Sequence, residues 1–217
     1  MVNSNLQAVI WDFGGVFSTS PFEAFTGYEK ERGLPEDFIR RINAINPDTN
    51  AWARLERSEV NADEFDELFA DEARAQGHHV PGKDILGLLS GAIRPKVVEA
   101  LHACKNHFKV GCITNNAPVG KGASMTSDPE KAKLVEEIFS SFDHVIESSK
   151  IGLRKPDPKI YELMCEALNV APAACVYLDD LGINLKPARA MGMTTIKVLN
   201  EAQLLSDLSE ATGLDLG

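Results

Sequence analysis

The sequence lacks the features of membrane-inserted, secreted and low-complexity proteins. No apolar run approaches the ~20 residues of a membrane span, and the first residues show no basic segment followed by a long apolar stretch. There is no internal repeat and no low-complexity tract. We therefore expect neither a signal peptide nor a membrane partner. We expect the protein to be cytoplasmic.

The sequence also has few cysteines and carries no net positive charge. The four cysteines form no CxxC pair and sit in apolar surroundings, which predicts buried free thiols in a reducing compartment; they are Cys104, Cys112, Cys165 and Cys175. The net charge is −10, so a general nucleic-acid surface, which needs basic patches, is not expected. A small anionic substrate is still compatible with this charge, because a metal ion and one lysine can reverse the field inside a pocket.

The 217 residues are enough for one buried core and a small second domain. Short apolar runs rich in β-branched residues predict strands buried on both faces, at Gln7–Asp12, Lys109–Thr114, His144–Glu147, Ala174–Leu178 and Thr194–Val198. Helical patterns separate the later runs, at Pro95–Asn106, Pro129–Ser140, Pro158–Asn169 and Asn184–Met191. This alternation predicts an α/β fold with a doubly wound parallel sheet.

The segment between Val16 and Arg94 is too long for a crossover loop and carries no strong strand signal. Helices are predicted there at Pro21–Arg32, Pro35–Ile45, Ala51–Arg57, Ala62–Gln76 and Asp84–Leu89. We expect a small helical cap domain over residues 18–93, inserted into a core domain of residues 1–17 and 94–217. Such a cap would cover the carboxyl ends of the strands, where doubly wound folds bind ligands.

Two predicted strands end in residues suited to phosphoryl chemistry. Asp12 ends the first strand and precedes Gly14 and Gly15, so its carboxylate is placed to attack phosphorus. Thr114 and Asn115 end the second strand, where a hydroxyl and an amide can donate to phosphoryl oxygens. Each motif alone is also typical of an ordinary turn.

Two later segments add opposite charges. Lys155 precedes Pro156 on a loop that the prolines stiffen, and its ammonium can neutralise charge at a transferring phosphoryl group, whereas the adjacent Arg154 is expected to be surface charge. Asp179 and Asp180 end a buried strand side by side, and such carboxylates repel each other unless a cation is present. Magnesium favours oxygen ligands, so Asp12 with Asp179 or Asp180 predicts a Mg²⁺ site.

In this order, the motifs Asp-x-x-Gly-Val, Ile-Thr-Asn, Lys-Pro-Asp-Pro and Leu-Asp-Asp-x-x-x-Asn resemble those of the haloacid-dehalogenase-like (HAD) hydrolase superfamily. The stretch from Val176 to Met193 is especially similar to the N-terminal phosphatase domain of soluble epoxide hydrolase and its bacterial relatives. The resemblance implies a Rossmann-like core, bound magnesium and an aspartyl-phosphate formed on the nucleophile.

Carried over position by position, the resemblance implies a role for each motif residue. Asp12 is nucleophile and metal ligand, and the Gly14 carbonyl is a second ligand. Thr114, Asn115 and Lys155 are catalytic and bind the phosphoryl group. Asp179 and Asp180 hold the metal, with Asp180 favoured as the direct ligand. The implied partner is a small phosphorylated metabolite, and the chain is expected to be a monomer or homodimer.

Gly14 is the one departure from the family pattern, which usually has a second aspartate there as general acid and base. Losing such a group typically slows a reaction by about two to four powers of ten. Three hypotheses follow: a magnesium-dependent phosphatase, a weakly active or non-catalytic phosphate-binding protein, and a 2-haloacid dehalogenase. The Asp179–Asp180 pair argues against the dehalogenase, because metal-free halide displacement has no use for clustered carboxylates. We favour the phosphatase.

Overall fold

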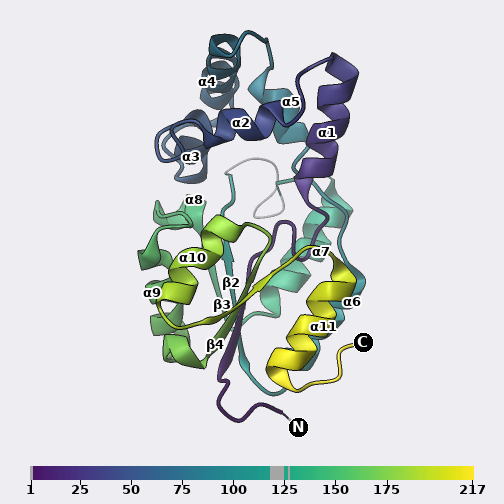
Figure 1. Cartoon of the computed structure of the whole chain (residues 1–217), viewed down its shortest axis with the longest axis vertical. Helices are drawn as coiled ribbons and strands as arrows, with labels where there is room; N and C mark the ends of the chain where they lie inside the picture. Colours follow the sequence, from purple (N-terminus) through teal and green to yellow (C-terminus); the bar gives the residue numbers. More distant parts are fainter. Residues whose placement is uncertain (1, 118–124, 127) are drawn as a thin grey trace.

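The computed structural model describes residues 2–117, 125–126 and 128–217. A five-stranded parallel sheet forms its centre, in the order β3-β2-β1-β4-β5 (Figure 1). The strands are β1 (Ala8–Trp11), β2 (Lys109–Thr114), β3 (His144–Glu147), β4 (Cys175–Asp179) and β5 (Thr194–Lys197), each within one residue of its predicted bounds. The predicted α/β fold with a parallel sheet is confirmed.

Helices cover both faces of the sheet. On one face pack α6 (Pro95–Lys105), α7 (Pro129–Ser140) and α11 (Glu201–Thr212), and on the other α9 (Pro158–Leu168) and α10 (Gly182–Ala190). Successive strand residues point to opposite faces, so Trp11 joins the first hydrophobic cluster and Ile10 the second. A short helix, α8 (Ser148–Ile151), follows β3, and a 3₁₀ turn (Pro172–Ala174) precedes β4. The four cysteines are free and buried, as expected.

The predicted cap consists of helices that share a separate hydrophobic cluster, which Ala117 of the predicted core also joins. They are α1 (Pro21–Arg32), α2 (Phe38–Ala44), α3 (Ala51–Glu56), α4 (Ala62–Ala75) and α5 (Gly82–Gly87). Asn61 and Glu64 form a reciprocal capping box at the start of α4, because each side chain accepts a hydrogen bond from the other's backbone N–H. Helix α2 begins three residues later than predicted, since Asp37 before it is left-handed at φ 56°.

The two chain segments that join cap and core lie side by side. Ser18 and Ile93 form an antiparallel bridge, and the Thr19 N–H donates to the Ala92 carbonyl at 2.8 Å. Beyond this ribbon the cap helices lie over the end of the sheet where the strands finish (Figure 1). The domain boundaries, residues 1–17 with 94–217 and residues 18–93, stay a prediction.

The stretch around Gly120 and Gly122, for which the sequence predicts a flexible loop, lies outside the described residues. Within the described ranges, no helix combines the length and the apolar character that crossing a membrane requires.

Candidate active site

The sheet order brings the predicted site residues to one edge. Strand β1 lies between β2 and β4, with Trp11 in register with Cys112 on one side and Leu178 on the other. Because all three strands are parallel, their carboxyl ends meet at the same edge. Asp12, Thr114 and Asp179 therefore lie next to one another, and all three are buried.

Lys155 is the centre of charge at this edge. Its side chain is 1% exposed, and its Nζ lies 2.7 Å from Asp12 Oδ1 and 2.9 Å from Asp179 Oδ2. A cis peptide bond between Lys155 and Pro156 shapes the loop that carries it. Burial works against the ammonium, but the carboxylates of Asp12 and Asp179 outweigh it and raise the pKa of Lys155. The lysine is therefore a charged, buried counter-ion.

The acids at the site outnumber this lysine. Carboxylate oxygens of Asp12, Asp179 and Asp180 lie within 4.8 Å of one another. Burial, together with the charges of Asp179 and Asp180, raises the pKa of Asp12 well above its ordinary value despite the attraction of Lys155. Burial and then the charge of Asp179 raise the pKa of Asp180 to about 6. Three acids facing one ammonium favour a further cation, and an all-oxygen set of this kind fits Mg²⁺.

Asp179 and Asp180 differ in how far their oxygens are already used. Asp179 is 0% exposed, and its carboxylate has five hydrogen-bond contacts with four donors: Lys155 Nζ at 2.9 Å, Tyr177 OH at 2.5 Å, the Leu181 N–H at 2.8 Å, and Asn184 Nδ2, which contacts both oxygens at 3.0 and 3.1 Å. The carboxylate of Asp180 accepts one long hydrogen bond from the side chain of another described residue, the Ser20 hydroxyl at 3.4 Å. Asp180 thus keeps the freer lone pairs of the two.

The two glycines after Asp12 have different surroundings. Gly15 has φ 72°, and a Cβ built there would lie 2.2 Å from Asp180 Oδ2, so a side chain would meet both strain and a clash. A Cβ on Gly14 would meet nothing within 4 Å. Arg94 steadies the same loop, because its Nη1 donates to the carbonyls of Gly15 at 2.8 Å and Val16 at 3.1 Å.

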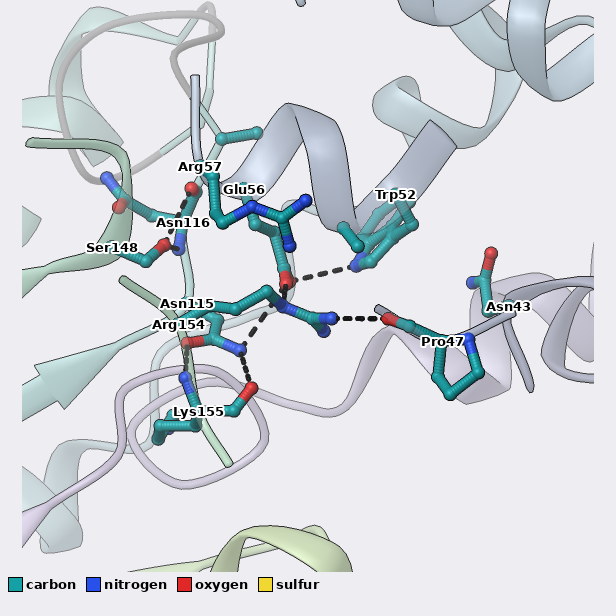
Figure 2. A network of polar contacts seen from close by, with 12 residues as sticks. Asn43, Pro47, Trp52, Glu56, Arg57, Asn115, Asn116, Ser148, Arg154 and Lys155 are labelled. Atoms are coloured by element: carbon teal, nitrogen blue, oxygen red, sulfur yellow. Dashed lines mark hydrogen bonds and ion pairs between the residues drawn. The ribbon is translucent and has the colours of Figure 1, made fainter. Parts of the chain in front are cut away.

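The side-chain amide of Asn115 is engaged by the Lys155 loop. Asn115 Oδ1 accepts the Lys155 N–H at 2.8 Å, and Nδ2 donates to the Lys155 carbonyl at 3.0 Å and to Glu56 Oε2 at 3.3 Å (Figure 2). These three contacts use both the oxygen and the NH₂ group of the amide. The side chain braces the lysine loop, whereas direct binding of a phosphoryl group by Thr114 and Asn115 stays a prediction.

Arg154 is not surface charge, and that prediction is wrong. Its Nε lies 2.6 Å from Glu56 Oε2 of the cap, its Nη1 donates to the Pro47 carbonyl at 2.8 Å, and its side chain is 19% exposed (Figure 2). The sequence analysis also missed Glu56, whose carboxylate is buried at the end of α3. A glutamate four residues after Trp52 and next to Leu55 on an apolar helix is the local signal that was available.

Comparisons with known proteins agree with this geometry. The family model described as haloacid dehalogenase-like hydrolase matches residues 6–192. The chain is 30% identical over 224 residues to bifunctional epoxide hydrolase 2 of Mus musculus, covering 96% of this chain and 39% of that protein. It is 28% identical over 200 residues to the phosphorylated carbohydrates phosphatase of Thermotoga maritima, covering 88% of this chain and 84% of that protein.

A solved structure shares the fold. A HAD family enzyme from Bacteroides thetaiotaomicron, crystallised with magnesium and inorganic phosphate, superposes with a TM-score of 0.56 at 19% identity, covering 90% of this chain and 96% of that one. At this identity the likeness bears on the fold alone.

The chain spans about two fifths of the length of the epoxide hydrolase.

A parallel sheet that gathers three carboxylates at one edge, two of them paired with a buried lysine, with a helical insertion after its first strand, defines a HAD-like hydrolase. The chain belongs to the haloacid dehalogenase-like hydrolase family. The resemblance drawn from the sequence motifs is thereby confirmed, and the relatives of the chain include phosphatases.

Proposed function

We propose that this chain is a magnesium-dependent phosphohydrolase of a small phosphorylated metabolite, and that Asp12 forms an aspartyl-phosphate. The observation that carries the proposal is the convergence of Asp12, Asp179 and Asp180 at the carboxyl edge of the sheet, with Lys155 paired to the first two. Nucleophile, counter-ion and metal-type oxygens are the parts that phosphoryl transfer requires. Relatives that act as phosphatases support it further.

The acid cluster fits a magnesium ion held by Asp12, the Gly14 carbonyl and Asp180. Asp179 completes the site mainly by holding Lys155, because its oxygens already accept from four donors. When bound, magnesium supplies positive charge against the phosphoryl oxygens. Thr114 and the Asn115 backbone are proposed to bind the same oxygens from the end of β2.

In the proposed reaction, one carboxylate oxygen of Asp12 attacks phosphorus while the bond from phosphorus to the leaving oxygen breaks. The leaving alkoxide takes a proton from water, because residue 14 has no carboxylate. Water then attacks the phosphorus of the aspartyl-phosphate, which frees Asp12 and releases inorganic phosphate carrying both protons of that water. Lys155 stays charged throughout and offsets the negative charge that develops beside Asp12.

The missing carboxylate at Gly14 favours a second candidate, a protein that binds phosphate and turns over weakly. Its signature would be Mg²⁺-dependent phosphate binding measured by calorimetry, without ester hydrolysis. The dehalogenase hypothesis has less support, since a reaction without metal leaves the carboxylate of Asp180 without a use. The predicted partners, namely no nucleic acid, no membrane and a monomer or homodimer, stay predictions.

The test is phosphate release from a panel of phosphate esters with Mg²⁺, with Asp12→Asn purified in parallel. We expect release by the unmodified chain, loss of release on adding EDTA, and none from Asp12→Asn. Equal release from both proteins would rule out Asp12 as the nucleophile. Halide release from a 2-haloacid without metal would instead support the dehalogenase.

A further inference from the structure

Glu56 is a cap carboxylate whose two oxygens face different parts of the molecule. It ends α3, and its side chain is 8% exposed. Oε1 accepts from Trp52 Nε1 at 2.9 Å, within the same helix. Oε2 lies 2.6 Å from Arg154 Nε and 3.3 Å from Asn115 Nδ2, both of the predicted core (Figure 2). One residue of the cap therefore contacts two loops at the carboxyl edge of the sheet.

The contact with Asn115 leads directly to the buried lysine. The Asn115 amide is bonded to both the N–H and the carbonyl of Lys155, and Lys155 Nζ is bonded to Asp12 Oδ1. A continuous chain of short polar contacts thus runs from Glu56 through Asn115 and Lys155 to the nucleophile. Because Asn115 is held on three sides, removing its cap partner frees one of the two N–H groups that orient it.

The same seam between cap and core has two further contacts. Arg154 Nη1 donates to the Pro47 carbonyl at 2.8 Å, and the Ser58 hydroxyl donates to the Ser149 carbonyl at 2.7 Å. Pro47 and Ser58 flank α3, so these contacts hold one end of the cap against the Arg154–Lys155 loop and against α8. Glu56 therefore both holds the cap against the core, through Arg154, and orients Asn115.

We propose that Glu56 is a positioning residue: through it, the seated cap holds Asn115, and Asn115 holds the Lys155 loop in the geometry that phosphoryl transfer needs. The inference rests on the proposed function, because it assigns Lys155 to the reacting site. Glu56 does not stand in for the carboxylate missing at Gly14, because Trp52, Asn115 and Arg154 already engage both of its oxygens.

The test compares three variants. Glu56→Leu removes the acceptor, and Glu56→Gln keeps an oxygen that can still accept from Asn115. Glu29→Leu is the matched control, because Glu29 is an equally buried cap carboxylate whose partners, the N–H groups of Asp37 and Ile39, lie within the cap. Each is assayed well below its melting temperature with two esters that differ in leaving group.

We expect Glu56→Leu to lower kcat by about ten- to a hundredfold, by the same factor for both esters, with KM little changed, because misplaced reacting groups slow the chemical step. Glu56→Gln should recover most of that loss, and Glu29→Leu should lower the melting temperature but leave kcat within about twofold. Unchanged kcat in Glu56→Leu would overturn the proposal. So would an effect confined to KM, or an equal fall of kcat in Glu29→Leu.

A spectroscopic measurement separates this inference from the proposed function. If the unmodified chain hydrolyses no ester, the proposed function fails, but the ¹⁵N–¹H signals of the Asn115 side-chain amide and of the Lys155 backbone amide can still be compared. Both should shift in Glu56→Leu and stay in place in Glu29→Leu. A Lys155 signal unmoved by Glu56→Leu contradicts the positioning role, whatever the activity.

Discussion

The backbone of Gly15 lies against the carboxylate of Asp180, so closely that a Cβ on this glycine would come within 2.2 Å of Asp180 Oδ2. The φ of 72° at Gly15 directs the chain into this contact, and Arg94 holds the next turn through the Gly15 and Val16 carbonyls. The loop after the nucleophile and the acid pair at the end of β4 are therefore packed as one unit.

Gly15→Ala should disrupt this unit, whereas Gly14→Ala should not. A side chain in the left-handed region costs about 1–2 kcal/mol, and here it must also displace Asp180. We expect Gly15→Ala to lower the free energy of unfolding by at least this amount, and to raise the Mg²⁺ concentration that half-saturates turnover. Gly14→Ala, with open space around its Cβ, should stay close to the unmodified chain in both measurements. Similar behaviour of the two variants would contradict the role given to Gly15.

Gly14→Asp should increase the rate of ester hydrolysis. The open space at Gly14 accommodates a side chain, and a carboxylate there can protonate the leaving oxygen and then activate water. General acid–base catalysis typically contributes about 10²–10⁴ in rate, so kcat should rise at least tenfold for esters with poor leaving groups. A smaller gain is expected for p-nitrophenyl phosphate, whose leaving group needs little protonation. A rate that falls for both esters would show that another group already supplies this proton.

Lys155→Met should destabilise the metal-free protein and abolish turnover. Removing the ammonium leaves Asp12 and Asp179 buried without their counter-ion, and breaking such a buried pair typically costs about 3–5 kcal/mol. Chemical denaturation without and with Mg²⁺ measures the effect, and added Mg²⁺ should restore part of the loss. Lys159→Met is the control, because Lys159 pairs with Glu162 at the surface of α9, 53% exposed. Equal unfolding free energies for the two variants would contradict a buried ion cluster.

Glu56 should give the protein a measurable dependence of stability on pH. Burial raises the pKa of Glu56 above its ordinary 4.5, although the charges of Arg154 and Lys155 and the hydrogen bond from Trp52 oppose the shift. The folded state thus holds this proton more tightly than the unfolded state, and the free energy of unfolding should fall as pH rises above about 4.5. Urea unfolding between pH 4.5 and 7 should show a flatter dependence for Glu56→Gln. Parallel curves for the two proteins would contradict the raised pKa.

The strands and most helices could be predicted because their signals are local. Four of the strands are short apolar runs that end at, or just before, a turn residue or an acid, and Asp128 before Pro129, a typical cap and first-turn pair, caps α7. Helix α11 is not among the predicted helices, although Asn200 caps it and Leu204 and Leu208 have helical spacing. Helix α8 is a single turn, too short for a periodic pattern to show.

The acids at the site could be predicted because each ends or follows a strand, and parallel strands bring such ends together. Lys155 could be predicted from the prolines that stiffen its loop. The pairing of Glu56 with Arg154 could not be, because the two residues lie 98 positions apart in different parts of the fold. Nothing in the neighbourhood of Arg154 distinguishes it from a solvated arginine. The two uses of Asn115, as ligand of phosphate or as brace of a loop, likewise depend on which groups surround it after folding.

The ribbon formed by Ser18, Thr19, Ala92 and Ile93 affects how the helical insertion can be altered during evolution. The chain leaves the sheet layer and returns to it at neighbouring points, so the backbone enters and leaves the helical insertion through a single narrow stalk, and side-chain contacts such as that of Glu56 with Arg154 hold the insertion to the core elsewhere. A longer, shorter or differently folded insertion could be joined to the core at the same two segments without disturbing the sheet. Substrate preference could then diverge by exchange of that insertion, while the carboxylates beneath keep one chemistry.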